Sequence, residues 1–402
     1  MVHFSRNPVW RHIFILYCLT FAVILPLFTY RLKFSMYYQK LTETEGEKKL
    51  KNENNARLEI VDRYALTMDS KIIKSLLHTS RETDLSVTVI TALRHSSSYK
   101  AKYLTQVVWT LLRLMLEAPS RDIHLSLQLS VCNVDSEPER HKEALELSSI
   151  VPVIERFGNN RKVPYTATVF EKEKQDYVFC LKAAQKSNPR YILALEDDAL
   201  PNEDFFVVLN HVIHNHLDYK ISKGEKTMNM DNITYVKLYH PERLQGFISL
   251  ESERLPELFG LSTVLGTLLF YIYLKTLAKK TFSHSTVLLV LISFIIYVAG
   301  LVIAIGRPNI NEVRHLFPPY LYGYTHAPHC CTPAMLFPAS GAHMVTEYLE
   351  KTTCYVGFAK DTALFKFVTK LGHTARMVQP NLVTHIGLYS SIRNKRLDPY
   401  VV

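Results

Sequence analysis

Charged residues are missing from three long apolar runs of the sequence, Ile13–Tyr30, Leu258–Leu274 and Ser285–Gly306. Each run is long enough to cross a bilayer as a helix, whereas buried helices of soluble domains rarely stay uncharged over such lengths. The lack of any acid or base inside them argues against a channel or transporter, because nothing would line a polar pathway. No small-residue cleavage site follows the first run, so we expect an uncleaved signal anchor and not a removed signal peptide.

Cysteine is also scarce, with six residues in 402, and Cys18 lies inside the first apolar run. The remaining five suit an oxidising compartment. We expect Cys132 and Cys180, which lie on neighbouring elements, to form a disulfide and Cys354 to stay unpaired. The segment HAPHCC, residues 326–331, offers ligands for zinc, but pairing is the more frequent use of cysteine in such a compartment.

Acidic residues are fewer than basic ones, which gives a net charge of +10. This charge suits an anionic partner such as a nucleotide diphosphate, a phospholipid or a phosphorylated glycan. The short linker between the second and third runs carries three lysines, and the flank before the second run carries three glutamates. These residues are Lys275, Lys279 and Lys280 in the linker, and Glu251, Glu253 and Glu257 in the flank. The positive-inside rule therefore places the linker in the cytosol and the bulk of the chain in the lumen, which disfavours nucleic acid as the partner.

The expected organisation follows from this topology, and Asn232, which begins an Asn-Ile-Thr glycosylation acceptor, agrees with it. No internal repeat stands out. The predicted segments are a cytosolic tail (1–12), a signal anchor (13–30), a lumenal stem (31–84), the first part of a catalytic domain (85–257), a transmembrane hairpin (258–306) with a cytosolic loop (275–284), and the second part of the domain (307–402). The second part is too short to be a separate domain of the same kind, so we expect the hairpin to interrupt a single lumenal domain.

The lumenal domain alternates strand-like and helix-like segments. The strand-like run DLSVTVITALR begins at Asp84, and a helical pattern follows in AKYLTQVVWTLLRLMLEA from Ala101. Further strand-like runs begin at Ile123 and Tyr191, with the helical EKEKQDYVFCLKAAQKS before the last. Such alternation predicts an α/β fold with a mostly parallel sheet, in which ligands bind beyond the carboxyl ends of the strands.

The run YILALEDDALP ends a strand-like stretch in three adjacent acids, Glu196, Asp197 and Asp198. Carboxylates repel one another, so they need either water or a cation between them. Placed at a strand end, they can hold Mg²⁺ or Mn²⁺ together with substrate phosphates. A solvated turn is the alternative use of the same residues.

This motif, with the lumenal topology, resembles the type A glycosyltransferases, whose fold is Rossmann-like. The segments EKEKQDY, KLYHPERLQ, CCTPAMLFPA, GFAKDTAL and PNLVTHIGL, spread over residues 85–402, are similar to those of the GalNAc transferases that modify GPI anchors. The resemblance implies Mn²⁺ or Mg²⁺ at Asp198 and Asp197, with Glu196 near the donor sugar. It implies Asp361 as the general base of an inverting transfer, although an aspartate at this point could instead cap the helix that follows it.

The resemblance also implies roles for residues elsewhere in the chain. His385 matches a histidine that reaches the metal or the diphosphate, although a single histidine is more often a satisfied core residue. Uridine is expected beside Ala92 and Arg94, where Leu93 departs from a family pattern that has an acid before the arginine. Two further donor contacts are implied, at Pro333 and Ala334. A vicinal disulfide is implied between Cys330 and Cys331. We interpret His211, His214 and His216 as a solvated helix face.

The expected function is a Golgi membrane enzyme that transfers GalNAc from UDP-GalNAc to a mannose of the GPI core on anchored proteins. One alternative is a lumenal transferase of the same fold that uses UDP-GlcNAc or an N-glycan acceptor. Another, of a different class, is a non-catalytic membrane protein that binds glycans or GPI proteins. Retention of both the acidic turn and Asp361 argues against the non-catalytic alternative.

Overall fold

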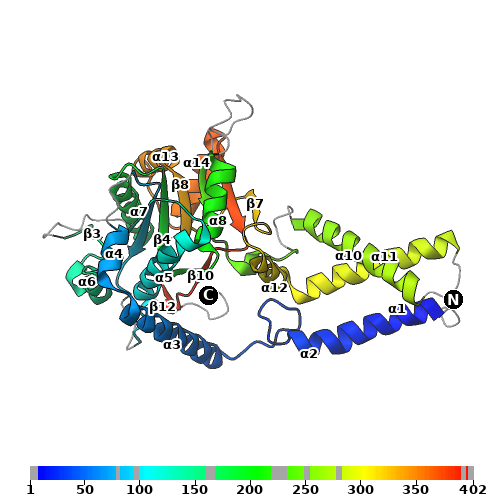
Figure 1. The fold of residues 1–402 in the computed structure, drawn as a ribbon. Coiled ribbons are helices and arrows are strands. Elements are labelled where there is room, and N and C mark those ends of the chain that lie inside the picture. Colours follow the sequence, from blue (N-terminus) through cyan, green and yellow to red (C-terminus); the bar gives the residue numbers. More distant parts are fainter. Residues whose placement is uncertain are drawn as a thin grey trace. The chain divides into compact units, whose positions relative to one another are not determined.

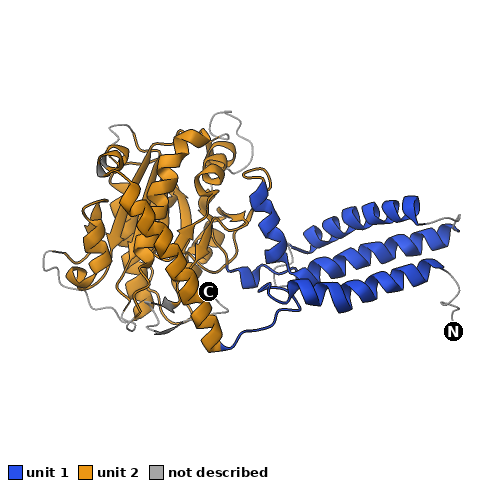
Figure 2. Ribbon diagram, turned by 60° about the horizontal axis from the view of Figure 1, so that its bottom comes forward, with its two compact units in different colours: residues 1–42, 241–316 blue, residues 43–240, 317–402 orange. Residues whose placement is uncertain are grey.

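The computed structural model describes residues 8–77, 82–94, 99–158, 168–218, 233–248, 254–277, 283–390 and 395–396. The chain forms two compact units, one of residues 1–42 with 241–316 and one of residues 43–240 with 317–402 (Figure 2). In the sequence, the second unit is therefore interrupted by part of the first. Five residues used above lie outside the described residues: Asn232, Glu251, Glu253, Lys279 and Lys280.

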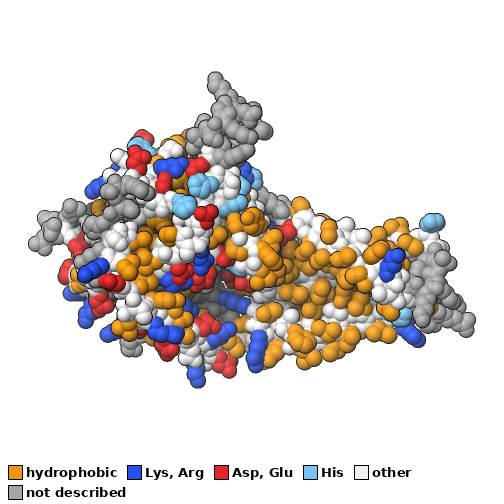
Figure 3. Space-filling view, in the orientation of Figure 1, with side chains coloured by type: hydrophobic (Ala, Val, Ile, Leu, Met, Phe, Trp, Pro, Cys, Tyr) orange, Lys and Arg blue, Asp and Glu red, His pale blue; other side chains and the backbone are white. Residues whose placement is uncertain are grey.

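Three helices of the first unit are long and apolar enough to span a membrane. The first begins as α1 (Pro8–Leu19), passes through a π-helical turn η1 (Thr20–Ile24) and ends as α2 (Leu25–Thr29). Pro26 follows the π turn, and its missing N–H explains why regular hydrogen bonding is interrupted there. The other two are α10 (Leu255–Thr276) and α11 (His284–Ile305). The sides of these three helices that are visible in Figure 3 carry mostly apolar side chains, as expected of surfaces that face lipid.

Small residues and buried hydroxyls hold these helices together. A Cβ at Gly266 would lie 2.7 Å from Cα of Ile295, so α10 and α11 approach too closely for any larger residue. The hydroxyls of Thr20 and Tyr297 are 2.8 Å apart and buried. The unit continues into α12 (Arg307–Asn311), whose first residue pairs with Glu257 at 2.8 Å. Short 3-10 turns lie at Glu242–Leu244 (η6) and Glu312–Leu316 (η8).

An eight-stranded sheet forms the centre of the second unit, in the order β3-β2-β1-β4-β8-β6-β9-β7 (Figure 1). The strands are β1 (Leu85–Thr91), β2 (Leu127–Asn133), β3 (Val153–Glu155), β4 (Tyr191–Glu196), β6 (Ile233–Lys237), β7 (Gly323–His326), β8 (Ala334–Pro338) and β9 (Thr374–Gln379). Strands β3, β2, β1 and β4 are parallel to one another, and β6 is parallel to β9. Strand β8 lies antiparallel between β4 and β6, so the segment after the hairpin completes the sheet begun before it.

Helices cover both faces of this sheet. One face packs against α3 (Glu43–Thr67), α4 (Ser70–Leu77), α5 (Tyr103–Glu117), α6 (Lys142–Leu147) and α8 (Phe205–Val212), and the other against α7 (Val169–Gln185), α13 (Ala339–Glu350) and α14 (Lys360–Leu371). In β4, Leu193 and Leu195 enter the first core while Ile192 and Ala194 enter the second. Burial on both faces explains why β4 reads as an unbroken apolar run. Shorter elements are η2 (Ala118–Arg121), η3 (Pro138–Arg140) and η4 (Ile213–Asp218).

The structure differs from the predicted stem at residues 31–84. Helix α3 packs against α5, where Val61 is buried and Arg57 Nε donates to Gln106 Oε1 at 3.0 Å. Residues 43–77 therefore belong to the α/β unit and are not a separate stem. The predicted disulfide is present, and Cys132 on β2 is bonded to Cys180 on α7.

Candidate active site

The acidic turn lies at the carboxyl end of β4, beside the end of β1. Two backbone hydrogen bonds fix it: Glu196 N–H donates to the Pro333 carbonyl at 2.8 Å, and Asp197 N–H donates to the Ile90 carbonyl at 3.1 Å. The chain then turns into β5 (Ala199–Pro201). The sequence correctly placed these acids at the edge of the sheet where ligands bind in α/β folds.

Each of the three adjacent acids points to a different set of partners. Glu196 Oε1 lies 3.6 Å from Lys360 Nζ. Asp197 accepts a hydrogen bond from the Thr91 hydroxyl at 2.7 Å and pairs with Arg94. Lys360 and Arg94 thus relieve the mutual repulsion of the first two acids, and no shared metal ion is needed for them.

Asp198 is held between a guanidinium and an imidazole. Its Oδ2 lies 2.9 Å from Arg94 Nη1 and 3.4 Å from His385 Nε2. Burial raises the pKa of Asp198, but Arg94 and then His385 outweigh burial and hold that pKa well below its usual range. Burial lowers the pKa of His385, and the Asp198 carboxylate more than reverses this effect and raises it. Asp198 is therefore an anion throughout the physiological pH range.

A short antiparallel pairing brings His385 to the acidic turn. Strand β10 (Val383–His385) pairs with β5, so that His385 lies opposite Ala199. Gly387 follows, and a Cβ at this position would lie 2.0 Å from Asp198 Oδ2 and 3.1 Å from Arg94 Nη1. Only glycine therefore permits this close approach. Gly387 could not be predicted from the sequence, because the signal is steric and cannot be seen from one sequence.

Arg94 contacts an aromatic ring in addition to its two carboxylates. Its guanidinium lies over the Tyr103 ring, 5.0 Å from the centroid. The Tyr103 hydroxyl accepts a hydrogen bond from Leu388 N–H at 2.9 Å, which connects α5 to the segment that carries His385. Burial lowers the pKa of Arg94, but Asp197 and Asp198 outweigh it and raise that pKa.

Lys360 is the second cation of the site, and sequence reasoning also missed it. Its side chain is 4% exposed, and Nζ lies 3.0 Å from Glu173 Oε1 and 4.3 Å from the centroid of the Tyr177 ring. Burial raises the pKa of Glu196, and the Lys360 ammonium opposes that rise. The only signal for Lys360 in the sequence was its position directly before Asp361.

Asp361 lies in the first turn of α14. Its Oδ1 accepts a hydrogen bond from Thr362 N–H at 2.7 Å, and its Oδ2 accepts one from Cys331 N–H at 3.2 Å. The N-cap of the helix is Ala359, so Asp361 is not the capping residue. The segment 331–333 contacts both Asp361 and Glu196, which joins the expected base to the acidic turn.

A cavity of about 240 Å³ opens beside the turn. It is lined by Ala92, Leu93 and Arg94 at one end and by Glu196 and Lys360 at another. The family pattern has an acid where this chain has Leu93. Here Leu93 N–H donates to Asp135 Oδ2 at 2.9 Å, so an acid from the segment that follows β2 lies beside Leu93. Pro333 and Ala334, expected to contact the donor, do not line this cavity.

The residues present fit a divalent cation at Asp198 better than at Asp197. Both oxygens of Asp197 already accept hydrogen bonds. Asp198 Oδ1 is buried, and among the described residues it has no hydrogen-bond partner. No group of three or more His, Cys, Asp or Glu side chains within the described ranges is arranged around a common point. One carboxylate with substrate phosphates is a usual way to hold Mg²⁺ or Mn²⁺.

Cys330 and Cys331 lie next to Asp361, with their sulfurs 2.6 Å apart. This separation exceeds a disulfide bond, so their pairing stays a prediction. Lys237 is buried beneath them and donates to the carbonyls of Pro328 at 2.8 Å and Cys330 at 2.7 Å. The predicted unpaired Cys354 is buried and free.

A three-layer α/β unit with adjacent acids at the end of a central strand, a cavity beside them and an aspartate joined to them through the segment 331–333 defines a type A glycosyltransferase. Comparison with known families makes the assignment specific. The model of the GPI-N-acetylgalactosamine transferase PGAP4 matches residues 85–384, which is most of the chain, so the chain belongs to this family. The match runs across the interrupting hairpin. The chain is therefore a GPI GalNAc transferase.

Proposed function

We propose that this enzyme works in the Golgi membrane and transfers GalNAc from UDP-GalNAc to a mannose of the GPI core. The observation that carries the proposal is the state of Asp198 in the acidic turn. Arg94 and His385 contact its Oδ2, while its buried Oδ1 has no hydrogen-bond partner among the described residues. The neighbouring Glu196 and Asp197 line a cavity with room for part of a nucleotide sugar.

The reaction is a single displacement that inverts the anomeric carbon. The acceptor oxygen forms a bond to that carbon while the bond from the carbon to the UDP oxygen breaks, and the electron pair leaves with UDP. The hydroxyl proton passes to Asp361, which lies at the start of α14 and is held by Cys331 N–H. Arg94 holds the acidic turn in register, because it pairs with both Asp197 and Asp198.

Asp198 would hold Mn²⁺ or Mg²⁺, with His385 as a second candidate ligand in its neutral form. Such an ion supplies positive charge for the diphosphate that leaves. Glu196, paired with Lys360, would accept hydrogen bonds from hydroxyls of the donor sugar. Ala92 and Arg94 line the end of the cavity at which uridine is expected.

The transmembrane helices give this chemistry a location. The lysine-rich linker places the loop between α10 and α11 in the cytosol, so that the α/β unit is lumenal. The hairpin interrupts the sequence of the catalytic unit and so anchors this unit to the membrane that carries the lipid-linked acceptor. Such anchoring reduces the entropy that the enzyme and the acceptor lose when they meet. Removing residues 258–306 while keeping the first helix should impair transfer to lipid-linked acceptors more than hydrolysis of UDP-GalNAc. Equal losses would indicate a folding role.

The direct test is transfer by the purified full-length enzyme to a GPI mannose glycan, with UDP-GalNAc and UDP-GlcNAc in parallel. We expect product from UDP-GalNAc, with the β configuration at the new bond by NMR, because displacement inverts the α-linked donor. Product only from UDP-GlcNAc would refute the proposed donor. Retention of configuration would refute the role given to Asp361.

A further inference from the structure

A second cavity lies on the other side of Arg94 and Asp197, and no role has yet been assigned to it. Its volume is about 400 Å³, within the usual range for small-ligand sites. Arg94, Asp197, Ala92 and Leu93 line both cavities, so the two share a wall. An enzyme with two substrates needs two binding regions, and here the second adjoins the first at the acidic turn.

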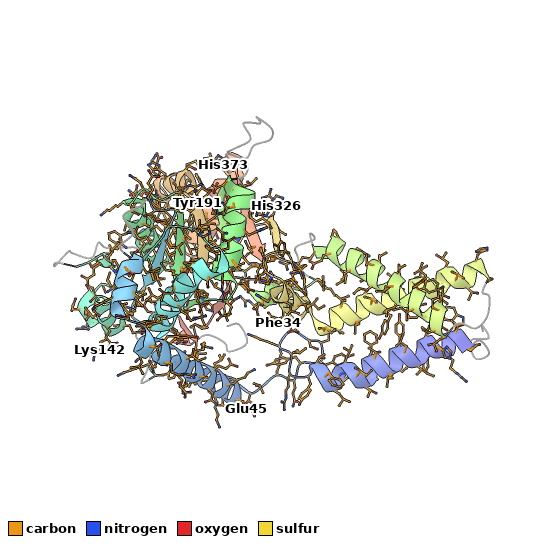
Figure 4. All side chains as sticks on the ribbon, in the orientation of Figure 1. Phe34, Glu45, Lys142, Tyr191, His326 and His373 are labelled. Carbon is orange, nitrogen blue, oxygen red and sulfur yellow. A yellow bond between two sulfur atoms is a disulfide. The ribbon has the colours of Figure 1, made fainter. Side chains whose placement is uncertain are left out.

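The two cavities differ in charge. Besides Arg94, the first is lined by two cations, Lys172 and Lys360, and by five acids: Asp135, Glu173, Asp176, Glu196 and Asp197. The second, apart from the shared wall, is lined by four cations: Lys100, Lys102, Arg140 and Lys142. Figure 4 labels Lys142, at the first position of α6. The two regions therefore select for different chemical groups.

Most acids and one cation of the second cavity are already engaged. Glu143 accepts hydrogen bonds from Thr105 N–H at 3.1 Å and its hydroxyl at 3.0 Å. Asp197 pairs with Arg94, and Arg140 pairs with Glu137 at 2.5 Å. What remains are three lysines, for which the described residues show no ion pair, against the single carboxylate of Glu146. This balance of charge favours an anionic ligand.

We infer that this cavity binds a phosphodiester of the acceptor. The inference rests on the proposed function, because a glycosylphosphatidylinositol acceptor carries a phosphodiester at its inositol by definition. The cavity does not reach Asp361 or Glu196, so it holds a part of the acceptor remote from the reacting hydroxyl. Lysine ammonium groups bind phosphate as point charges, which suits a flexible diester. The subsite selects a phosphorylated glycan over a neutral one.

The test compares two acceptors that differ in the phosphodiester: a mannose-containing glycan that ends in glycerophosphoinositol, and the same glycan ending in inositol. The variant is Lys100→Gln with Lys142→Gln, and the matched control is Lys186→Gln with Lys370→Gln. Lys186 and Lys370 are exposed and lie outside both cavities.

For the wild type we expect a lower KM for the phosphorylated glycan than for the inositol glycan. The KM of the phosphorylated glycan should rise with ionic strength. The cavity variant should raise that KM about tenfold, equivalent to about 1.4 kcal/mol, and leave the KM of the inositol glycan and of UDP-GalNAc near wild type. The control variant should behave as wild type. Equal KM values for both glycans in the wild type, or equal losses on both in the variant, would overturn the inference.

A rise in the KM of UDP-GalNAc would also overturn it, because the cavity would then serve the donor diphosphate. Calorimetric titration with the phosphorylated glycan, in EDTA and without donor, tests binding independently of turnover. Binding that weakens in the cavity variant, without any transfer by the wild type, would support the subsite while refuting the proposed reaction. Transfer with no preference for the phosphorylated glycan would refute the subsite while supporting the proposed reaction.

Discussion

Replacing Lys360 with Met leaves two carboxylates without their cation. In the wild type, Nζ lies 3.0 Å from Glu173 and 3.6 Å from Glu196. Removing one partner of a fully buried pair costs about 3–5 kcal/mol. The two glutamate side chains are 23% and 34% exposed, so water screens part of the loss. We therefore expect about 2 kcal/mol of destabilisation, intermediate between a buried and a surface pair.

Thermal unfolding of the solubilised full-length enzyme measures this cost. For the α/β unit of residues 43–240 and 317–402, 2 kcal/mol corresponds to a midpoint that is lower by roughly 3–4 °C. The control is Lys370→Met, an exposed lysine in the last turn of the same helix, for which we expect a much smaller change. Adding Glu173→Gln and Glu196→Gln to the Lys360→Met variant should restore stability, because no unpaired charge then remains.

The defect of the Lys360→Met variant should also depend on pH. Burial already raises the pKa of Glu196 in the folded wild type, and loss of the ammonium raises it further. A carboxyl whose pKa is higher in the folded state than in the unfolded state stabilises the fold as pH falls through the folded pKa. The defect should therefore be smaller near about pH 5.5 than near about pH 7.5. A midpoint unchanged from wild type at both pH values would refute the reasoning.

Four further predictions concern the site and its support. Gly387→Ala should lower turnover at least about 100-fold, because its Cβ would displace Asp198, whereas Gly260→Ala, with open space around it, should not. Asp361→Asn should lower kcat about 10²–10⁴-fold without unfolding the enzyme, since the amide oxygen still accepts a backbone N–H; a retained kcat would exclude this general base. EDTA should stop UDP release and Mn²⁺ should restore it, and release that persists in EDTA would argue against a metal. Replacing Cys132 and Cys180 with Ala should cost about 4 kcal/mol from the 48-residue separation, measured by denaturant unfolding, and an unchanged midpoint would contradict this.

Much of the fold could be predicted from the sequence because its signals are local. The apolar runs, the alternation that begins at Asp84 and the acids after β4 each depend on a short stretch of chain. The interruption of the α/β unit followed from the length of the segment after Arg307. The stem was mispredicted because the polar surface of α3 hides the few residues, such as Val61, that pack against α5.

The parts of the site that the sequence could not supply depend on contacts between distant segments. Lys360 meets Glu196 only because α14 begins beside the end of β4. His385 reaches Asp198 through the pairing of β10 with β5, which no periodicity indicates. Asp135 supplies an acid beside Leu93 from another strand, so the departure from the family pattern could not be interpreted from the motif alone.

The central claim is that Asp198 anchors a metal-dependent transfer from UDP-GalNAc. The most direct test is UDP release by the purified full-length enzyme with a GPI mannose glycan, with and without Mn²⁺, for the wild type and Asp198→Ala. We predict Mn²⁺-dependent release from UDP-GalNAc that is lost in the variant, while Asp204→Ala, a nearby aspartate outside the acidic turn, retains it. Release by Asp198→Ala at the wild-type rate would contradict the account.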